Sequence, residues 1–494
     1  MNLSESIEVL RLMCDLKIPT NSIFCQSLLK KIQREIGSLT DLNFINVEEL
    51  WILLKKMRKS TLVISIMNDL KITQKSFNKE QSIYSMCSNL YRAANSMHVN
   101  KELLISIMQS ISNYRGEIPI FSAISIYNSC LKFPEILTNE NIDFRKIENV
   151  IITNSKQVTY GHVCKILLTI AKLSAQKKLH DPYNPELIDS LISAQLTRKL
   201  SFENEIEILS YLQQIGHLNT NLLDDLIVKC LEDQFLIMNL SRVDLLKFTG
   251  VLSICVETPP LWDLIKNIIL KNKICKDITI PLAYNLTVLN FRPQQLISEA
   301  LKITESKYYN LYEYTRNQAL FVYQVIKTLD KDYNGPWPSR TVLKAILQQK
   351  SIITHAQINE DVLCTLEKAL GGSEYVQSTL LTTYRHFINH IVVMRKGGFP
   401  MAINHSDNKK TVTYIDDIIV PSDSKIIAIL YFDTDNYLRN INKLKTQFVL
   451  YMKSIEALGY SVIPLNLKEW TSMSNKDKIP FIMNEIKSRY PDEI

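Results

Sequence analysis

Apolar residues recur every three or four positions over most of the first 400 residues of the chain. In the segment 4–16, Ile7, Leu10 and Met13 fall on one face of a helix, and Pro19 follows where a helix would end. The same spacing predicts further helices at 47–57, 82–97, 101–111, 121–131, 162–173, 185–200, 203–215 and 222–235. Short polar breaks separate most of them, which is typical of stacked helical hairpins.

Two short sequences recur at the distance expected for such hairpins. Ile-Ser-Ile-Met occurs at 64–67 and again at 105–108, and Asp-Leu-Ile occurs at 225–227 and again at 263–265. Both spacings fall within the repeat length of known helix pairs, which is about 34 to 47 residues. The pattern therefore favours a helical-hairpin repeat array, with an irregular helical bundle as the alternative.

The pattern changes after residue 395. Lys-Gly-Gly-Phe-Pro at 396–400 breaks the helical spacing, and 411–415 and 418–420 look like short extended pieces. An apolar run at 425–432 predicts a buried strand. The elements that follow it are predicted as a helix at 443–458 closed by Gly459, a strand at 460–465 and a helix at 476–489. Strand, helix, strand, helix predicts a small α/β domain.

Composition narrows the class of protein. Glycine is scarce, with 11 residues in 494, which favours helices over strand-rich folds. The net charge of +7 permits an anionic partner without requiring one. The nine cysteines form no C-x-x-C pair, so we expect reduced, mostly buried thiols and no zinc ribbon.

Neither membrane insertion nor a targeting leader is indicated. No apolar run reaches the roughly 18 to 20 residues of a membrane helix. The first residues carry Glu5, Glu8 and Asp15, whereas transit peptides are poor in acidic residues.

The carboxyl-terminal segment 425–487 resembles the RAP domain. The specific part is Leu-Gly-Tyr-Ser-Val-Ile-Pro-Leu at 458–465, followed by Glu469 and Trp470. Upstream, LAYNLTVLNFRP at 282–293 resembles the LN-aromatic-x-P element of a first FAST module, and DKDYNGP at 330–336 resembles an element of the second. In this order and spacing, the motifs resemble the FAST kinase domain-containing (FASTK) family.

The resemblance implies a mainly α fold: a helical-hairpin repeat solenoid followed by a small α/β RAP domain of degenerate, nuclease-like PD-(D/E)XK type. We therefore expect this domain order: 1–240 helical-hairpin array, 241–310 helical FAST module 1, 311–400 helical FAST module 2, 401–424 linker and 425–487 RAP domain. It also implies a mitochondrial location and RNA metabolism, namely transcript stability, processing, translation or ribosome assembly.

The sequence lacks the residues that nuclease or kinase activity requires. Where many RAP domains read E-x-D-G-P-x-H-F, this chain reads LYFDTDNY at 430–437, leaving only Asp433 and Asp435 nearby. A metal nuclease needs converging carboxylates. Kinase loops of the G-x-G-x-x-G, H-R-D and D-F-G types are missing. We expect no enzyme activity, no cofactor and no metal.

Two histidines have the spacing of paired ligands on a helix. His386 and His390 stand four residues apart on a segment predicted to be helical, but Phe387 occupies the place of the glutamate in H-E-x-x-H. Packing or surface histidines are favoured over a metal site.

Candidate RNA contacts gather after the first RAP strand. The predicted helix there carries basic residues interleaved with tyrosines, and Lys468 flanks Trp470, which we expect in the core. Cations neutralise phosphates and aromatic rings stack on unpaired bases. The candidate RNA-binding residues are Tyr437, Arg439, Lys443, Lys445, Lys453 and Lys468.

The resulting hypothesis is a non-catalytic factor that binds single-stranded mitochondrial RNA, with RNA-processing or ribosomal proteins as possible partners. The basic clusters at 30–34 and 55–59 would suit a concave helical array that holds RNA, although charged outer faces are ordinary. One alternative is a protein-binding helical scaffold. The other is a residual metal-dependent RNA endonuclease.

Overall fold

The computed structural model describes residues 3–16, 18–38, 50, 53–54, 57, 60–76, 83–95, 101–133, 142–175, 182–254, 276–307, 311–347, 358–403 and 413–490. The chain divides into two compact units, 1–199 and 200–494. Each unit is described by itself.

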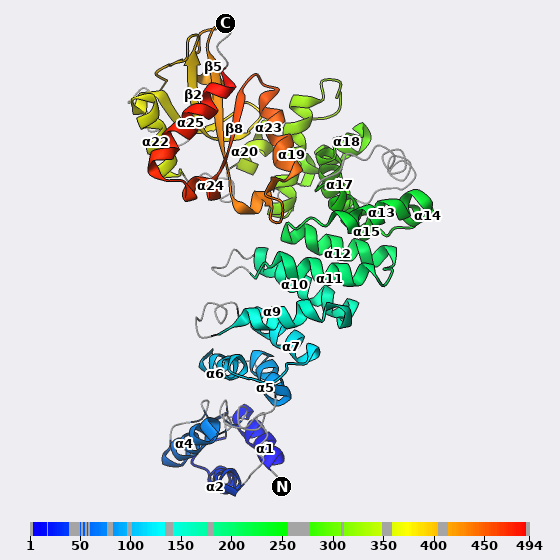
Figure 1. The fold of residues 1–494 in the computed structure, drawn as a ribbon, viewed down its shortest axis with the longest axis vertical. Helices are drawn as coiled ribbons and strands as arrows, with labels where there is room; N and C mark the ends of the chain where they lie inside the picture. Colours follow the sequence, from blue (N-terminus) through cyan, green and yellow to red (C-terminus); the bar gives the residue numbers. More distant parts are fainter. Residues whose placement is uncertain are drawn as a thin grey trace. The chain divides into compact units, whose positions relative to one another are not determined.

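The first unit is helical. Helix α5 packs against α6 and α7, and α7 packs in turn against α9 and α10 (Figure 1). This neighbour-to-neighbour packing confirms the predicted helical repeats. The elements are α1 (Leu3–Asp15), α2 (Ile23–Ser38), α4 (Thr61–Ser76), α5 (Ile83–Asn95), α6 (Lys101–Ser112), α7 (Ile120–Leu131), α9 (Phe144–Thr153), η1 (Ser155–Gln157), α10 (Tyr160–Ala175) and α11 (Pro185–Leu196).

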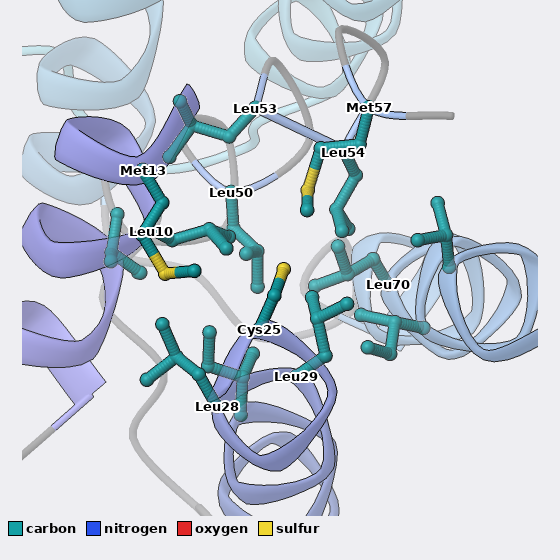
Figure 2. Packing of buried hydrophobic residues seen from close by; sticks show 14 residues of the cluster. Leu10, Met13, Cys25, Leu28, Leu29, Leu50, Leu53, Leu54, Met57 and Leu70 are labelled. Carbon is teal, nitrogen blue, oxygen red and sulfur yellow. The ribbon is translucent and has the colours of Figure 1, made fainter. Parts of the chain in front are cut away.

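The amino-terminal core shows why the apolar spacing predicts these helices. Leu10 and Met13 of α1 meet Leu28 and Leu29 of α2, and Leu70 of α4 closes the cluster (Figure 2). All five side chains are buried. Of the predicted segments, 47–57 and the repeat copy at 263–265 lie mostly or wholly outside the described residues.

The helical part of the second unit continues the same arrangement. Helices α12, α15, α17 and α19 pack one against the next, while α13 and α18 lie beside α12 and α17. The bounds are α12 (Phe202–Ile215), α13 (Thr220–Glu232), α14 (Phe235–Met238), α15 (Arg242–Leu252), α17 (Lys276–Val288), α18 (Gln294–Lys307), α19 (Glu313–Leu329) and α20 (Arg340–Leu347).

The two FAST-like sequence elements contact each other. The first closes α17 through Asn290, whose φ of 61° is left-handed, and Phe291 N donates to Leu286 O at 2.8 Å. From this turn, Arg292 Nη1 donates to Leu329 O at 3.2 Å, at the start of the second element. The motifs therefore join the ends of α17 and α19.

The predicted helical module 311–400 is wrong over residues 376–395. These residues form β1 (Val376–Leu381) and β2 (Phe387–Arg395) after helix α22 (Glu360–Leu370) and the turn η3 (Ser373–Tyr375). Sequence spacing misses them because β2 is buried along nearly its whole length. A continuous apolar run fits a buried strand and a buried helix equally well, so the spacing of apolar residues cannot distinguish them.

One sheet organises the α/β domain. The sheet contains β4 (Thr413–Tyr414), β5 (Lys425–Phe432) and β8 (Ser461–Asn466) in addition to β1 and β2, in the order β4-β1-β2-β5-β8. β5 is antiparallel to β2 and parallel to β8, while β3 (Phe399–Pro400) pairs with β2. Residues of α22 and α25 (Asn475–Arg489) cover one face, and residues of α23 (Thr446–Glu456) cover the other (Figure 1). A sheet covered by helices on both faces agrees with the predicted small α/β domain at the carboxyl end.

The described part of 401–424 belongs to this domain and is not a free linker. β4 (Thr413–Tyr414) pairs with β1, and Ile403 N donates to Glu374 O at 2.8 Å. Ile415, in the turn η4 (Ile415–Asp417), is buried in the face under α23. The extended piece predicted at 418–420 is not a strand.

The rest of the α/β domain follows the prediction except in one place. β5, β8 and α25 lie where they are expected, and Gly459 has the left-handed φ of 95° predicted for a helix cap. The helix predicted at 443–458 begins later, because 437–444 form the turn-linked strands β6 (Tyr437–Leu438) and β7 (Lys443–Leu444) after η5 (Thr434–Asn436). Trp470 lies in a short helix, α24 (Leu467–Ser472). No helix among the described residues has the length and apolar character needed to cross a membrane.

Candidate functional site

The sequence pattern predicted that the candidate cations after β5 share one helix, and this prediction is wrong. Only Lys453 lies on α23, whereas Lys445 is the residue before it and Lys443 lies in β7. Tyr437 lies in β6 and Arg439 in the turn after it. The hairpin has two sides, and the structure divides the residues between them.

Three of the six candidate RNA-binding residues lie around one contact between the hairpin and α24. Asn442 Nδ2 donates to Glu469 Oε1 at 3.0 Å, which ties the hairpin to α24 and brings Lys443 near Lys468. Both lysines are exposed. Tyr437 is half-buried, and its pKa is raised by burial and by the charge of Glu469. We call Tyr437, Lys443 and Lys468 the open face.

Two of the six face the helical part of the same unit instead. Arg439 N donates to Gly216 O at 2.7 Å at the end of α12. A Cβ at Gly216 would lie 3.4 Å from both Arg439 Cγ and Lys445 Nζ. Burial lowers the pKa of Arg439 and that of Lys445, whose Nζ donates to Asp435 O at 2.8 Å. These cations are therefore poorly placed for solvent-borne RNA.

Polar side chains beside them hold the hairpin against the helices. The Asn440 side chain makes two hydrogen bonds with the backbone of Leu218. Its Oδ1 accepts from Leu218 N at 3.1 Å, and its Nδ2 donates to Leu218 O at 2.7 Å. Thr446 Oγ1 donates to Ile254 O at 2.7 Å. We call Arg439, Asn440, Lys445 and Thr446 the docking face.

Trp470 is part of the core, as expected. It is fully buried between α22 and α25, and its Nε1 donates to Asp361 Oδ2 at 2.7 Å. Lys478 Nζ pairs with the same carboxylate at 2.7 Å, and this bond is the first cause of the lowered Asp361 pKa. Trp470 therefore has no free ring face for a base.

A cavity of about 710 Å³ lies where α17 and α19 meet the sheet and α23. Its edge reaches Asn436 and Leu467, the neighbours of Tyr437 and Lys468 in the open face. The lining is rich in aromatic and amide side chains: Tyr284, Tyr314, Asn317, Gln318, Leu320, Phe321, Gln324, Ile358, Asn359, Arg385, Phe387, Asn389, Leu430, Tyr431, Phe432, Asp433, Asn436, Gln447, Phe448, Tyr451 and Leu467.

The end of a strand ladder forms one wall of the cavity. Pairing between β2 and β5 ends at His390 and Ile429. One residue further, the Asn389 side chain accepts from Tyr431 N at 2.9 Å in place of a backbone partner. Opposite Asn389, Thr379 has a φ of 61°, and such irregularities in a strand often redirect a neighbouring side chain.

The two histidines lie on and beside β2, so the predicted helix is wrong. The imidazole of His386 lies 2.8 Å from Thr382 Oγ1 and 2.9 Å from Ser454 Oγ, while His390 contacts Ser378 and Tyr431 hydroxyls. Burial lowers the pKa of His386 to about 3 and that of His390 to about 4. Both are neutral packing residues, the interpretation that the sequence favoured.

Asp433 and Asp435, the two carboxylates after β5, are not arranged as metal ligands. Asp433 caps the turn η5: its side chain accepts from Asn436 N, and its own N donates to Asn436 Oδ1 at 2.6 Å. Asp435 is exposed. Across the described part of the chain, no three His, Cys, Asp or Glu side chains converge as a metal site would require.

Sequence reasoning missed the cavity because its walls come from segments far apart in the chain. Asn317 and Gln318 lie in α19, Arg385 before β2 and Tyr431 in β5. The one available signal was the Ile, Val and Met run at 391–394, which also suits a buried strand.

Comparison with known proteins supports the resemblance. The RAP domain family matches residues 429–485, inside the predicted range 425–487. FAST kinase domain-containing protein 1, mitochondrial, of Xenopus laevis is 22% identical over 240 residues, 42% of this chain and 27% of that protein. The Mus musculus protein of the same name is 20% identical over 385 residues, 68% of this chain and 46% of its own length. The Homo sapiens protein is 25% identical over 128 residues.

The chain thus covers between about a quarter and a half of the length of these frog and mouse relatives. The relatives are named as mitochondrial proteins, which supports the mitochondrial location that the sequence motifs imply. The chain thus carries a match to the RAP domain at its carboxyl end and is similar to FAST kinase domain-containing proteins.

Proposed function

We propose that this protein is a non-catalytic factor that binds single-stranded RNA in mitochondrial RNA metabolism, acting in transcript stability, processing, or translation and ribosome assembly. The RAP domain and the family support an RNA-associated role. The observation that carries the proposal is the open face, where Lys443 and Lys468 are exposed at the Asn442–Glu469 contact, with the half-buried Tyr437 close to Glu469 and an aromatic cavity next to them. Cations with adjoining rings suit the phosphates and bases of an unpaired strand.

The side chains at the strand ends support the non-catalytic part of the proposal. Asn389, Tyr431 and Asn466 stand there, and Asp433, which follows β5, caps a turn. Hydrolysis assisted by a metal needs several oxygen ligands on one ion. The nuclease alternative therefore draws no support from this arrangement.

The test of RNA binding is a double substitution in the open face. In the full chain, Lys443→Ala with Lys468→Ala should weaken binding of a single-stranded RNA in a filter assay. The slope of log affinity against log salt should flatten by about 0.7 per lost phosphate contact.

The matched control removes the same charge elsewhere in the domain. Lys476→Ala with Lys487→Ala changes two exposed lysines of α25. If both double variants weaken binding equally, the open face is not the site, and net charge alone accounts for the affinity.

A second role as a protein-binding scaffold is favoured by one observation. Leu16, Ile23 and Phe24, between and on α1 and α2, have exposed fractions of 72%, 89% and 62%. Where exposed apolar side chains form a contiguous patch, the patch commonly marks a partner surface. RNA-processing or ribosomal proteins that co-purify after ribonuclease treatment would support this role.

A further inference from the structure

The cavity beside the open face has the chemistry of a nucleotide pocket. Its volume of about 710 Å³ lies within the range of about 300–1,000 Å³ usual for small-molecule sites. We propose that it takes up one unpaired nucleotide of the RNA, whose base carries an exocyclic amino group. This inference rests on the proposed RNA-binding function, and it adds a position that discriminates between bases.

Two orphaned acceptors carry the argument. Gln318 is 5% exposed, yet its Oε1 has no hydrogen-bond partner among the described residues, and neither does the buried Oδ1 of the adjacent Asn317. Both side chains line the cavity. Buried acceptors without partners are rare in proteins, so their presence at a cavity indicates donors supplied by a ligand.

The acceptors define which bases fit best. Adenine and cytosine each present an exocyclic amino group with two N–H donors on the Watson–Crick edge, and guanine presents an amino group and a ring N–H. Uracil presents only one ring N–H. Unpaired bases in RNA are commonly read on this edge by hydrogen bonds from the protein.

The rings supply a place for the base itself. Tyr284 and Phe321 pack edge to face with centroids 5.1 Å apart, and the Tyr284 hydroxyl donates to Gln447 on α23. Tyr451 is fixed from the other side, its OH accepting from Phe387 N at 2.7 Å. Held rings lose little freedom when a planar base packs against them.

Arg385 supplies the charge for a phosphate. It lines the cavity, half-buried, and its guanidinium lies 4.8 Å from the Tyr414 ring centroid. Within the described ranges it forms no ion pair with a carboxylate. Its backbone is also held, with φ of 71° and Arg385 O accepting from Gln324 Nε2 at 2.8 Å. A partly desolvated cation without an anionic partner is suited to a phosphodiester.

The experiment measures base discrimination by the full chain. Fluorescence anisotropy measures the affinity for a strand of about 12 uridines, which is about the length of one single-strand binding site. It compares this strand with the same strand in which one central uridine is replaced by adenosine or cytidine. The wild-type protein should bind the adenosine and cytidine strands at least about fivefold more tightly. Equal affinities for all three strands would overturn the inference while leaving general RNA binding intact.

Substitutions then separate the pocket from the open face. Gln318→Leu should bring the affinity ratio close to one, while the melting temperature stays the same or rises because an unsatisfied buried group is removed. Lys443→Ala with Lys468→Ala should weaken all strands equally and keep the ratio. A ratio unchanged by Gln318→Leu would exclude this residue and overturn the assignment.

The matched control is Gln195→Leu in the first unit. Gln195 is buried like Gln318 and also has an unpartnered Oε1 among the described residues, but it lies on α11. It should leave the ratio unchanged. If Gln318→Leu does not fold, Arg385→Gln serves instead and should weaken the adenosine strand more than the uridine strand.

A final arm distinguishes RNA from free nucleotides as the source of the ligand. Equilibrium dialysis with AMP, CMP and UMP tests whether the pocket binds a mononucleotide by itself. If the protein distinguishes the RNA strands but does not retain AMP at millimolar concentration, the pocket captures a nucleotide within RNA. Retention of AMP by a protein that binds no RNA strand would overturn both the proposed function and this inference.

Discussion

The docking face and the open face place similar polar side chains in opposite surroundings. On the docking face, Arg439 and Asn440 bond to the backbone of the α12–α13 turn, and the cations there are partly desolvated. On the open face, Lys443 and Lys468 stay in solvent. Charge on the docking face serves cohesion within the second unit, whereas charge on the open face stays available to a ligand. Residue type alone does not distinguish these uses.

The largest expected effect concerns the core behind both faces. Trp470→Ala should lower the free energy of unfolding by about 3–5 kcal/mol, because it empties a fully buried ring site and removes a hydrogen-bond donor from the Asp361 carboxylate. Urea unfolding of the full chain measures this. A small loss of stability combined with a large loss of RNA affinity would show that Trp470 is a stacking platform after all.

Acid should destabilise the same domain through its buried histidines. Their folded pKa values are about 3 and about 4, against about 6.5 in an unfolded chain. As the pH falls below 6.5, the two histidines are protonated in the unfolded state but not in the folded state. The free energy of unfolding therefore falls until the pH reaches the folded pKa values. By pH 5 the two histidines together should cost about 4 kcal/mol relative to pH 8.

The histidine effect is measured by unfolding at a series of pH values. His390→Gln keeps a neutral hydrogen-bonding side chain and should remove roughly half of the acid loss. An unchanged pH profile in this variant would contradict the assignment.

Within the hairpin, two asparagines test the docking face against the open face. Asn440→Ala should cost about 1–3 kcal/mol, because it leaves Leu218 N and O without their partner at a partly buried contact. Asn442→Gly removes only an exposed bond, and glycine tolerates the left-handed φ of 49° at this position, so stability should change by less than about 0.5 kcal/mol. Equal losses in the two variants would remove the distinction between the faces.

The smallest effect on stability is expected on the open face. Lys443→Ala with Lys468→Ala should leave the unfolding free energy within about 0.5 kcal/mol of the wild type, since both side chains are exposed to solvent. Arg439→Ala with Lys445→Ala should lose more, because these side chains pack on Gly216. A melting curve of each double variant compares them.

The helical array could be predicted in some detail because its signals are local. The pattern of Leu10 and Met13 predicts the face of α1 that meets α2, and the helix predicted at 203–215 ends at residue 215, where Gly216 follows with a left-handed φ of 81°. Such signals depend on neighbours three or four residues apart, so the sequence carries them without reference to the rest of the fold. The same applies to β5, β8 and Gly459 in the RAP segment.

The strands β1 and β2 and the cavity were decided only by tertiary structure. Whether 388–394 is helix or strand depends on β5, which pairs with it but follows in the chain only after β3 and β4. Likewise, whether a lysine near position 440 meets solvent or Gly216 depends on the end of α12, which lies far earlier in the chain. The family motifs identify the kind of domain from sequence. Whether a polar side chain is buried and hydrogen-bonded or exposed to solvent depends on which distant segment packs against it. Burial and hydrogen-bond partners exist only once the chain has folded.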